Sequence, residues 1–285
     1  MRKISIVTDS DASLPDDLAQ AHHIYQVPIS IHFGDEVFES GINIDDESLF
    51  ERVNRENVLP TTAAPTPGKF EQIFEQAFAN DGSEALVCLC VSGEISTTHN
   101  SAKLAAEDLP HRKIIVMDTR SLSFGQGFMA LAASKAIDNG ASLDEVIRSA
   151  ESIGSRVHLF GALSTLKYLS MSGRVSHLAA GMAGMLDIKP ILSIQNGKLE
   201  MIEKVRTRKK SLERIIELAK KESAHSQIEQ MAVVHVSALH EAQAFKTMLS
   251  TTLDFTGEII MAALTPGLSV HTGSGMLAVG FVTDD

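Results

Sequence analysis

The sequence predicts an α/β protein with two domains, and three observations support that prediction. In the first half, short apolar runs rich in β-branched residues alternate with amphipathic stretches, which is typical of a mostly parallel sheet flanked by helices. In the second half, apolar runs on both sides of Asn196-Gly197 indicate an antiparallel hairpin, so we expect a mixed sheet there. The length of 285 residues suits two ordinary domains. We therefore expect an N-terminal α/β domain over 1–155, a C-terminal α/β domain over 156–285, and a ligand in the cleft between them.

The elements of the first half can be placed in order. The run 3–10 indicates a buried strand, and Ser13 is a candidate N-cap for the next helix, because acidic residues fill its first turn. Ser142 and Glu145 form a capping box at the start of a later helix. Further strands are expected at 25–33, 34–40, 84–92 and 113–121, and helices at 47–56, 67–80, 101–109, 127–140 and 142–154.

The second half opens with a predicted strand at 157–163 and a helical segment at 164–186 that is rich in Gly and Met. That segment fits either ordinary core or the wall of a tunnel for a flexible chain, because thioether side chains adapt their shape. The hairpin around Asn196-Gly197 spans 188–206. The remaining elements are expected to be helices at 209–223 and 240–250, and strands at 231–236, 258–264 and 276–282.

Charge and cysteine content limit the classes of partner. The 36 acidic side chains outnumber the 25 basic ones and give a net charge of −11, which disfavours nucleic acid or an anionic membrane. No apolar run reaches the length of a membrane span and no signal-peptide pattern is seen, so we expect a cytoplasmic protein. Cys88 and Cys90 share one face of a predicted strand, and we expect them to be buried apolar residues rather than a metal site.

Four polar loops at strand ends are candidates for ligand binding. They carry hydroxyl side chains and precede helices, whose N-termini present free N–H groups to an anion. For any single hydroxyl, capping of the helix is the simpler explanation. Two hydroxyl-rich loops at neighbouring strand ends nevertheless favour a small anionic group such as a carboxylate. The four loops lie at 7–10, 59–70, 91–102 and 118–127.

Two enzymatic interpretations have weaker support. The stretch GQGFMA at 125–130 matches the dinucleotide fingerprint, but it starts well after Asp118 instead of in the tight turn that follows the strand. A serine hydrolase with Ser96 as nucleophile and His271 as base is an alternative, although the chain lacks the G-x-S-x-G elbow of such enzymes.

His271 is the most conspicuous candidate for polar chemistry. It lies in SVHTGSGML (269–277), a mixture that suits no regular helix and interrupts any strand, so we expect a loop. Gly273 and Gly275 would let the backbone approach a ligand closely. An isolated histidine is more often structural than functional, so His271 alone decides no function.

These motifs together resemble the DegV family, the bacterial fatty-acid-binding proteins that serve fatty acid kinase. The resemblance covers nearly the whole chain and rests on PTTAAPTPGKF, SGEISTTHNSA, VMDTRSLSFGQG, LKYLSMSGRVS, LDIKPIL, EKVRTRKKSL and HTGSG. It implies a protein without turnover of its own, which binds a long-chain fatty acid in a buried tunnel. A separate ATP-dependent kinase would convert the presented carboxylate to an acyl phosphate. A regulatory module that senses the lipid is a further alternative.

The resemblance also implies roles for particular residues, with no cofactor and no metal. The carboxylate would meet hydroxyls of the threonine and serine loops and the histidine, and the kinase would dock on Arg174 and Arg206. The chain departs from the family pattern at Ala63, Ala64, Gly93, Thr97 and Ser274. The expected carboxylate-binding residues are Thr61, Thr62, Ser92, Gly93, Ser96, His271 and Thr272.

Overall fold

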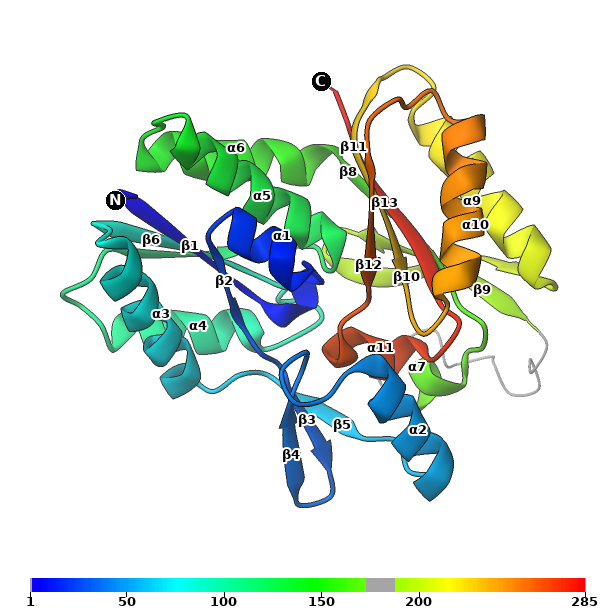
Figure 1. Cartoon of the computed structure of the whole chain (residues 1–285), viewed down its shortest axis with the longest axis horizontal. Coiled ribbons are helices and arrows are strands. Elements are labelled where there is room, and N and C mark those ends of the chain that lie inside the picture. Colours follow the sequence, from blue (N-terminus) through cyan, green and yellow to red (C-terminus); the bar gives the residue numbers. More distant parts are fainter. Residues whose placement is uncertain (1, 173–187, 285) are drawn as a thin grey trace.

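The computed structural model describes residues 2–172 and 188–284 and contains three sheets. Figure 1 shows a four-stranded sheet beside a six-stranded sheet, with a small three-stranded sheet below the junction of the two. The strand orders are β2-β1-β6-β7, β10-β9-β8-β13-β11-β12 and β4-β3-β5. The predicted fold class is thereby confirmed, since an N-terminal parallel sheet with helices is followed by a C-terminal mixed sheet. The exact division near residue 155 stays a prediction.

The four-stranded sheet is parallel throughout and covered on both faces, and every residue of its central strands β1 and β6 is buried. Helices α3 and α4 pack on one face, and α5 lies on the other beside α6.

The predicted capping box of Ser142 and Glu145 begins α6. Ser13 is not the N-cap of α1: it adopts a left-handed conformation after a short 3-10 turn, and α1 begins behind Pro15. The strands are β1 (Ile4–Asp9), β2 (Ile24–Val27), β6 (Ala85–Cys90) and β7 (Ile114–Asp118). The helical elements are η1 (Ser10–Ala12), α1 (Asp16–Ala21), α3 (Pro67–Asp81), α4 (Thr98–Glu107), α5 (Phe124–Asp138) and α6 (Leu143–Arg156).

The three-stranded sheet was not anticipated. The predicted strand at 25–33 is divided at Pro28, which has no N–H to donate to a ladder, so its two halves belong to different sheets. The second half pairs with the threonine loop, because Ile31 lies opposite Thr62 in an antiparallel ladder. The threonine loop is therefore partly a strand. The elements are β3 (Ser30–Phe33), β4 (Glu36–Glu39), β5 (Thr61–Ala63) and the helix α2 (Asp46–Glu56).

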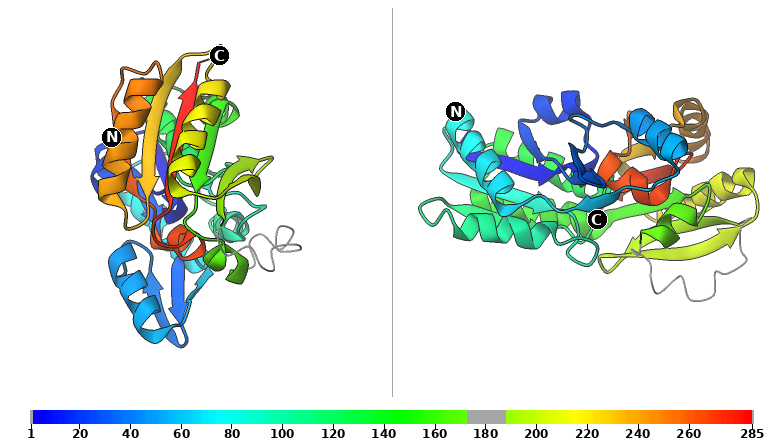
Figure 2. Two further views of the ribbon diagram at one scale, coloured as in Figure 1. Left: turned by 90° about the vertical axis from the view of Figure 1, so that its right-hand side faces the viewer. Right: turned by 90° about the horizontal axis from the view of Figure 1, so that it is seen from below.

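The six-stranded sheet is mixed, with β11 and β12 as its parallel pair. Helices α9 and α10 cover its outer face, while the inner face turns toward α5 and the N-terminal half (Figures 1 and 2). The predicted hairpin is confirmed, since Asn196 and Gly197 both have positive φ, at 52° and 83°. The strands are β8 (Val157–Ala162), β9 (Lys189–Gln195), β10 (Lys198–Val205), β11 (Ile228–His235), β12 (Ile259–Ala263) and β13 (Leu277–Thr283). The helices are α7 (Lys167–Met171), α9 (Arg208–Glu222), α10 (Leu239–Thr252) and α11 (Pro266–Thr272).

Helix α5 joins the two large sheets, which accounts for the glycines of GQGFMA. A Cβ on Gly125 would lie 2.0 Å from Oγ of Ser121 and 2.8 Å from Cδ1 of Leu159, so a glycine lets the start of α5 approach β8. Gln126 is fully buried and donates from Nε2 to Oγ1 of Thr8 at 2.8 Å. Gly125 and Gln126 thus serve the packing of α5 between the two sheets. This agrees with the low support for a dinucleotide site in the sequence.

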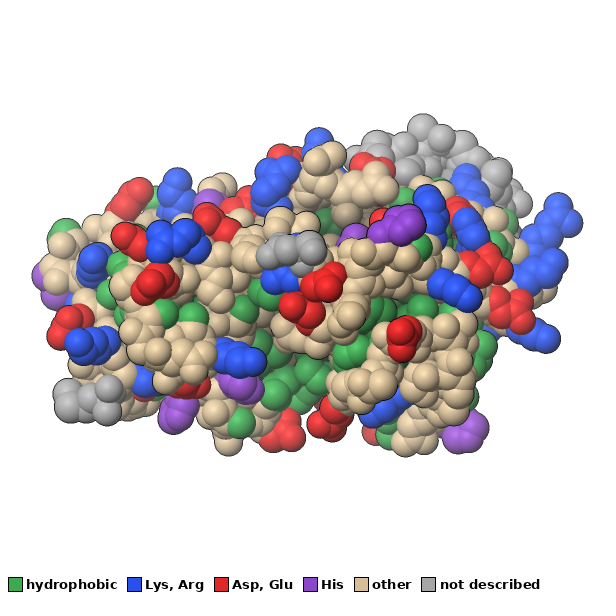
Figure 3. Space-filling model, turned by 90° about the horizontal axis from the view of Figure 1, so that it is seen from above, with side chains coloured by type: hydrophobic (Ala, Val, Ile, Leu, Met, Phe, Trp, Pro, Cys, Tyr) green, Lys and Arg blue, Asp and Glu red, His purple; other side chains and the backbone are tan. Residues whose placement is uncertain are grey.

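The surface agrees with the charge balance of the sequence. Acidic and basic side chains are interspersed over the face shown in Figure 3. Within residues 2–172 and 188–284, no helix is both long and apolar enough to cross a bilayer. Cys88 and Cys90 are buried in β6 with their sulfur atoms 3.6 Å apart, on one face of the strand as predicted.

Candidate functional site

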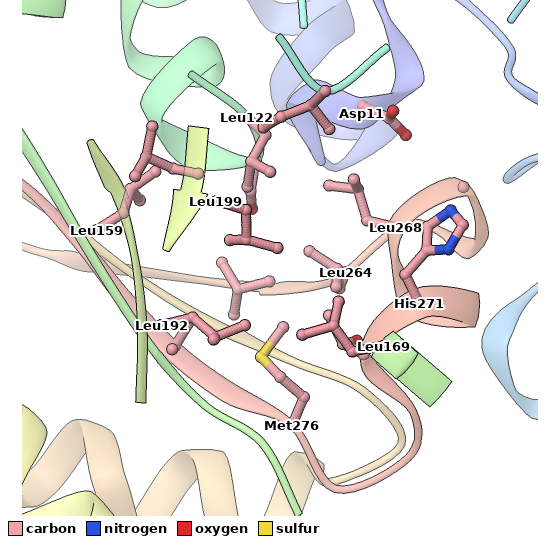
Figure 4. A pocket seen from close by; sticks show the side chains of 18 of the residues that line it. Asp11, Leu122, Leu159, Leu169, Leu192, Leu199, Leu264, Leu268, His271 and Met276 are labelled. Atoms are coloured by element: carbon pink, nitrogen blue, oxygen red, sulfur yellow. The ribbon is translucent and has the colours of Figure 1, made fainter. Parts of the chain in front are cut away.

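One candidate site is an apolar cavity between the N-terminal and C-terminal halves (Figure 4). It encloses about 1030 Å³ free of protein atoms, part of which is continuous with solvent. Most of the wall is aliphatic, and the polar side chains on it are Asp11, Thr62, Ser96, Ser123, Ser193, His271 and Thr272.

Thr62 and His271 form the polar contact that brings the two halves together at this cavity. Oγ1 of Thr62, in β5, lies 3.0 Å from Nε2 of His271, in α11. The residues are 209 positions apart in sequence, so the fold and not local chain geometry creates the pair. In Figure 4 the imidazole lies at one side of the cavity, across from Leu159 and Leu192. The arrangement is a mostly apolar space with a hydroxyl and an imidazole at one side.

His271 is in a helix, so the prediction of a loop is wrong. Pro266 occupies the first turn of α11 and the left-handed Gly273, at φ 81°, ends the helix. The helix spans only seven residues. Its start signal, Thr265-Pro266, was given less weight in the sequence than the glycines that follow the helix. His271 therefore belongs to the last turn of a rigid element, which fixes the position of its side chain better than a loop would.

Helix α11 is held in place by hydrogen bonds to three N-terminal segments. Thr265 donates from Oγ1 to the Ser10 carbonyl at 2.8 Å. The N–H of Gly267 donates to Oγ of Ser40 at 3.0 Å. Four residues after Thr265, Ser269 donates from Oγ to Oδ1 of Asp46 at the start of α2. Together these bonds set the position of His271 relative to Thr62.

Gly267 makes this close approach possible. A Cβ there would lie 2.5 Å from Oδ1 of Asp11 and 3.1 Å from Cβ of Ile29. Asp11 lines the cavity and was missed in the sequence, although it follows the polar TDS motif directly. Its backbone N–H donates to Oδ1 of Asp9 at 3.0 Å.

Asp9 is a fully buried carboxyl that connects two of the polar loops. Burial raises its pKa to about 6, and the N–H groups of Val91 and Asp11 partly oppose that rise. The Val91 bond, at 2.8 Å, fixes the start of the serine loop to the end of β1. Asp9 thus supports the site without lining the cavity.

The other predicted carboxylate-binding residues fall into two groups. Ser96 and Thr272 line the same cavity as Thr62 and His271, and Oγ of Ser96 shares a hydrogen bond with Oγ1 of Thr98 at 2.8 Å. Thr61 is exposed. Ser92 is buried and donates to the carbonyl of Gly197 at 2.7 Å, so its hydroxyl anchors the β9–β10 turn.

Gly93 lines a second, more polar cavity that adjoins the first. This cavity lies at the N-termini of α3 and α4 and has about 960 Å³ free of protein atoms, including open solvent. Thr62 and Ser96 are in the walls of both cavities, so the polar end of the apolar space borders a solvent-accessible region. The N–H of Gly93 donates to Oδ1 of Asp118 at 3.2 Å.

Of the two predicted docking residues, Arg206 is among the residues that the structure describes. Arg206 is exposed between the end of β10 and the start of α9. Arg174 lies outside the described residues, as do Met182 and Met185 of the predicted tunnel wall. The aliphatic wall that the structure does describe comes largely from other elements, including Leu192, Leu199 and Ile194 of the hairpin.

Asp46 has an unusual environment for a carboxyl beside the site. Burial raises its pKa to about 7, the hydrogen bond from Ser269 acts in the opposite direction, and the charge of Asp45 adds to the rise. Because the carboxyl accepts a bond from α11, its protonation is coupled to the element that carries His271.

The chain matches a family model described as "Uncharacterised protein, DegV family" over residues 3–284. It is 31% identical over 278 residues to a DegV domain-containing protein of Streptomyces coelicolor, with 98% of both chains covered. It is 30% identical over 277 residues to Protein DegV of Bacillus subtilis, covering 97% of this chain and 98% of that one.

Solved structures of DegV family proteins share the fold of this chain. A structure described as "Fatty Acid Binding of a DegV family Protein from Thermus thermophilus" superposes with a TM-score of 0.90 at 26% identity, with 100% of both chains covered. "DegV, a fatty acid binding protein from Bacillus subtilis" superposes with a TM-score of 0.89 at 29% identity, again with 100% of both covered.

The environment of Asp46 predicts a pH dependence of stability. A carboxyl whose pKa is raised from 3.8 to about 7 on folding stabilises the fold fully below pH 4 and loses that contribution as pH rises to about 7. We expect Asp46→Asn to keep the Ser269 bond and to raise the free energy of unfolding at pH 8 by about 1–2 kcal/mol relative to the wild type. At pH 4 the two should be equal in urea denaturation. Glu47→Gln, on the exposed side of the same helix, is the control and should show no such pH-dependent difference.

Proposed function

Because the chain belongs to the DegV family, we propose that it binds a long-chain fatty acid in the apolar cavity and presents the carboxylate to a separate ATP-dependent kinase. The observation that carries the proposal is the Thr62–His271 pair at one side of a mostly aliphatic space. The fatty-acid binding described for the Thermus and Bacillus proteins, which share the fold over the full chain, supports the same ligand class here.

The alkyl chain would supply most of the binding free energy. Each methylene moved from water into an apolar wall contributes about 0.8 kcal/mol. A long acyl chain therefore offsets the cost of association and of ordering its own bonds, which together amount to several kcal/mol. The chain would extend from His271 toward Leu159 and Leu192, across the cavity.

The head group would fix the register of the chain. A hydrogen bond to an ionised carboxylate contributes about 1.5–3 kcal/mol, and Thr62, Ser96, His271 and Thr272 line the cavity with groups that can donate one. Ala63 and Ala64 also line it and offer no side-chain donor, so the set is smaller than the family pattern implies. In this proposal Ser92 and Gly93 hold the surrounding loops, and Thr61 has no contact with the ligand.

Presentation requires that a phosphoryl donor can reach the carboxylate. The polar cavity at the starts of α3 and α4 shares Thr62 and Ser96 with the apolar one, and it supplies that route. In the proposed reaction a carboxylate oxygen attacks the γ-phosphorus of ATP on the kinase, giving acyl phosphate and ADP. Arg206, exposed between the end of β10 and the start of α9, is the proposed contact for the kinase.

Loss of the head-group donors should weaken binding of the acid selectively. We expect Thr62→Val and His271→Ala each to lower the affinity for hexadecanoate by about 10–100-fold, because each removes one bond to the carboxylate. The affinity for hexadecanol should change less, because the alkyl contacts are kept. Isothermal titration of the delipidated protein measures both.

Matched controls separate this effect from general damage. Thr61→Val changes the neighbouring, exposed residue of β5, and His240→Ala removes an exposed imidazole at the start of α10. Both should bind hexadecanoate as the wild type does. A wild type that carries no acid in native mass spectrometry, and cannot be loaded with one, contradicts the proposal. Hydrolysis of p-nitrophenyl esters that is lost with Ser96→Ala and His271→Ala would instead support the hydrolase alternative.

The kinase step has its own test. With a bacterial fatty acid kinase and ATP, the loaded protein should yield acyl hydroxamate in the presence of hydroxylamine, and the protein without kinase should yield none. Arg206→Glu should lower the rate at least about 10-fold and leave fatty-acid affinity unchanged, a loss expected for one interfacial charge contact. Lys113→Glu, exposed at the opposite ends of the strands, is the control. No acyl phosphate with any kinase would favour a lipid-sensing role.

A further inference from the structure

Gly161 occupies a position where a glycine has no evident structural purpose. It lies in β8, which pairs with β13 on one side and β9 on the other. Glycine in the interior of a strand weakens the sheet and often marks a place where a ligand approaches closely. Its φ is outside the left-handed range, so the backbone does not require glycine.

No close neighbour requires glycine at this position either. Among the described residues, the single heavy atom within 4 Å of a Cβ built on Gly161 is Cβ of Ala278, at 3.6 Å, an ordinary contact. Gly280, two residues along β13, is different, since a Cβ there would lie 2.8 Å from Cδ2 of Leu159. The space that a side chain at position 161 would fill is the cavity itself, which Gly161 lines.

The register of the sheet places Gly161 within the length of the cavity. Gly161 is opposite Ala278 and Leu192, and Ala278 is opposite Val234, so these four residues form one row across the inner face. All four line the cavity. The two central residues, Gly161 and Ala278, are the smallest of the row. The wall of the cavity is therefore recessed between the larger side chains of the other two residues.

The row can also be placed along β8 relative to the segment that follows α11. The end of β8 adjoins the segment after α11, because Oγ of Ser164 donates to the carbonyl of Gly275 at 3.0 Å. Leu163, Gly161 and Leu159 follow in that order away from this contact, and all three line the cavity. With a rise of about 3.3 Å per residue, Gly161 is about 7 Å deeper than Leu163. Beyond it the space continues to Leu159.

We propose that residue 161 determines the length of acyl chain that the protein accepts, with glycine admitting the chain past the middle of the cavity to Leu159. The inference rests on the proposed function and adds its substrate range. A side chain at position 161 would fill the recess in the cavity wall. The inner part of the cavity would then be closed to a long acyl chain, and the outer part would still accept a short one.

The experiment compares dodecanoate with octadecanoate on delipidated full-length protein. Gly161→Leu should lower the affinity for octadecanoate about 50-fold, equivalent to about three methylenes that can no longer be buried. The affinity for dodecanoate should fall less than about 3-fold. Gly161→Ala should give a small change in the same direction, so the effect follows side-chain volume.

Two further variants keep the test decisive. Ala278→Leu, on the neighbouring strand, should shift the preference in the same way, and it replaces Gly161→Leu should that variant fail to fold by circular dichroism. Gly68→Leu is the matched control, because Gly68 is exposed with no neighbour within 4 Å of its Cβ position, and it should behave as the wild type.

The outcomes separate this inference from the proposed function. A wild type that binds neither acid contradicts both. A wild type that binds the acids, together with Gly161→Leu and Ala278→Leu variants of unchanged preference, overturns the role of residue 161 and leaves the fatty-acid proposal standing. Equal loss of both acids in a folded Gly161→Leu variant also overturns it, since the position would then block entry rather than limit length.

Discussion

The position of α11 is the constraint on which the candidate site depends. This seven-residue helix is too short to be stable alone, and its hydrogen bonds to η1, the end of β4 and α2 take the place of helical propensity. Because those partners are in the N-terminal half, the same bonds that stabilise α11 bring His271 to Thr62. The site is therefore complete when the two halves are packed together, and it would be lost if they separated. Asp46 accepts one of these hydrogen bonds, from Ser269. Burial of its carboxyl disfavours the charged form.

The fold class could be predicted from the sequence because its signals extend over long windows. Buried apolar strands alternating with capped helices, and Asn196-Gly197 in the second half, are each sufficient to indicate their elements. The third sheet could not be foreseen, since β5 has three residues and shows no periodicity, and the division at Pro28 was concealed by apolar residues on both sides. Helix α11 was also missed because it is short. Short elements owe their conformation to tertiary contacts that no local pattern records.

The site was predicted unevenly, and the difference has a physical cause. The threonine loop and His271 stood out as polar candidates by residue type, and the family resemblance implied their role. The structure brings Thr62 and His271 within hydrogen-bond distance. Ser92 has the same residue type but its hydroxyl is used by the Gly197 carbonyl, which a sequence does not reveal. The aliphatic wall was equally hidden, because a leucine that faces a cavity and one that faces the core follow the same alternation along a strand. Gly161 was hidden as well, because a glycine in a central strand can also serve close packing, as Gly280 does against Leu159.

In the proposed function an acyl chain lies in the apolar cavity with its carboxylate at Thr62 and His271. A crystal structure of the protein loaded with hexadecanoate tests that claim most directly. We expect continuous electron density from the polar end to the inner wall, with a carboxylate oxygen within hydrogen-bond distance of Oγ1 of Thr62 or Nε2 of His271. Density with the carboxylate at the Leu159 end, or a cavity closed by side chains while the acid binds elsewhere, would contradict it.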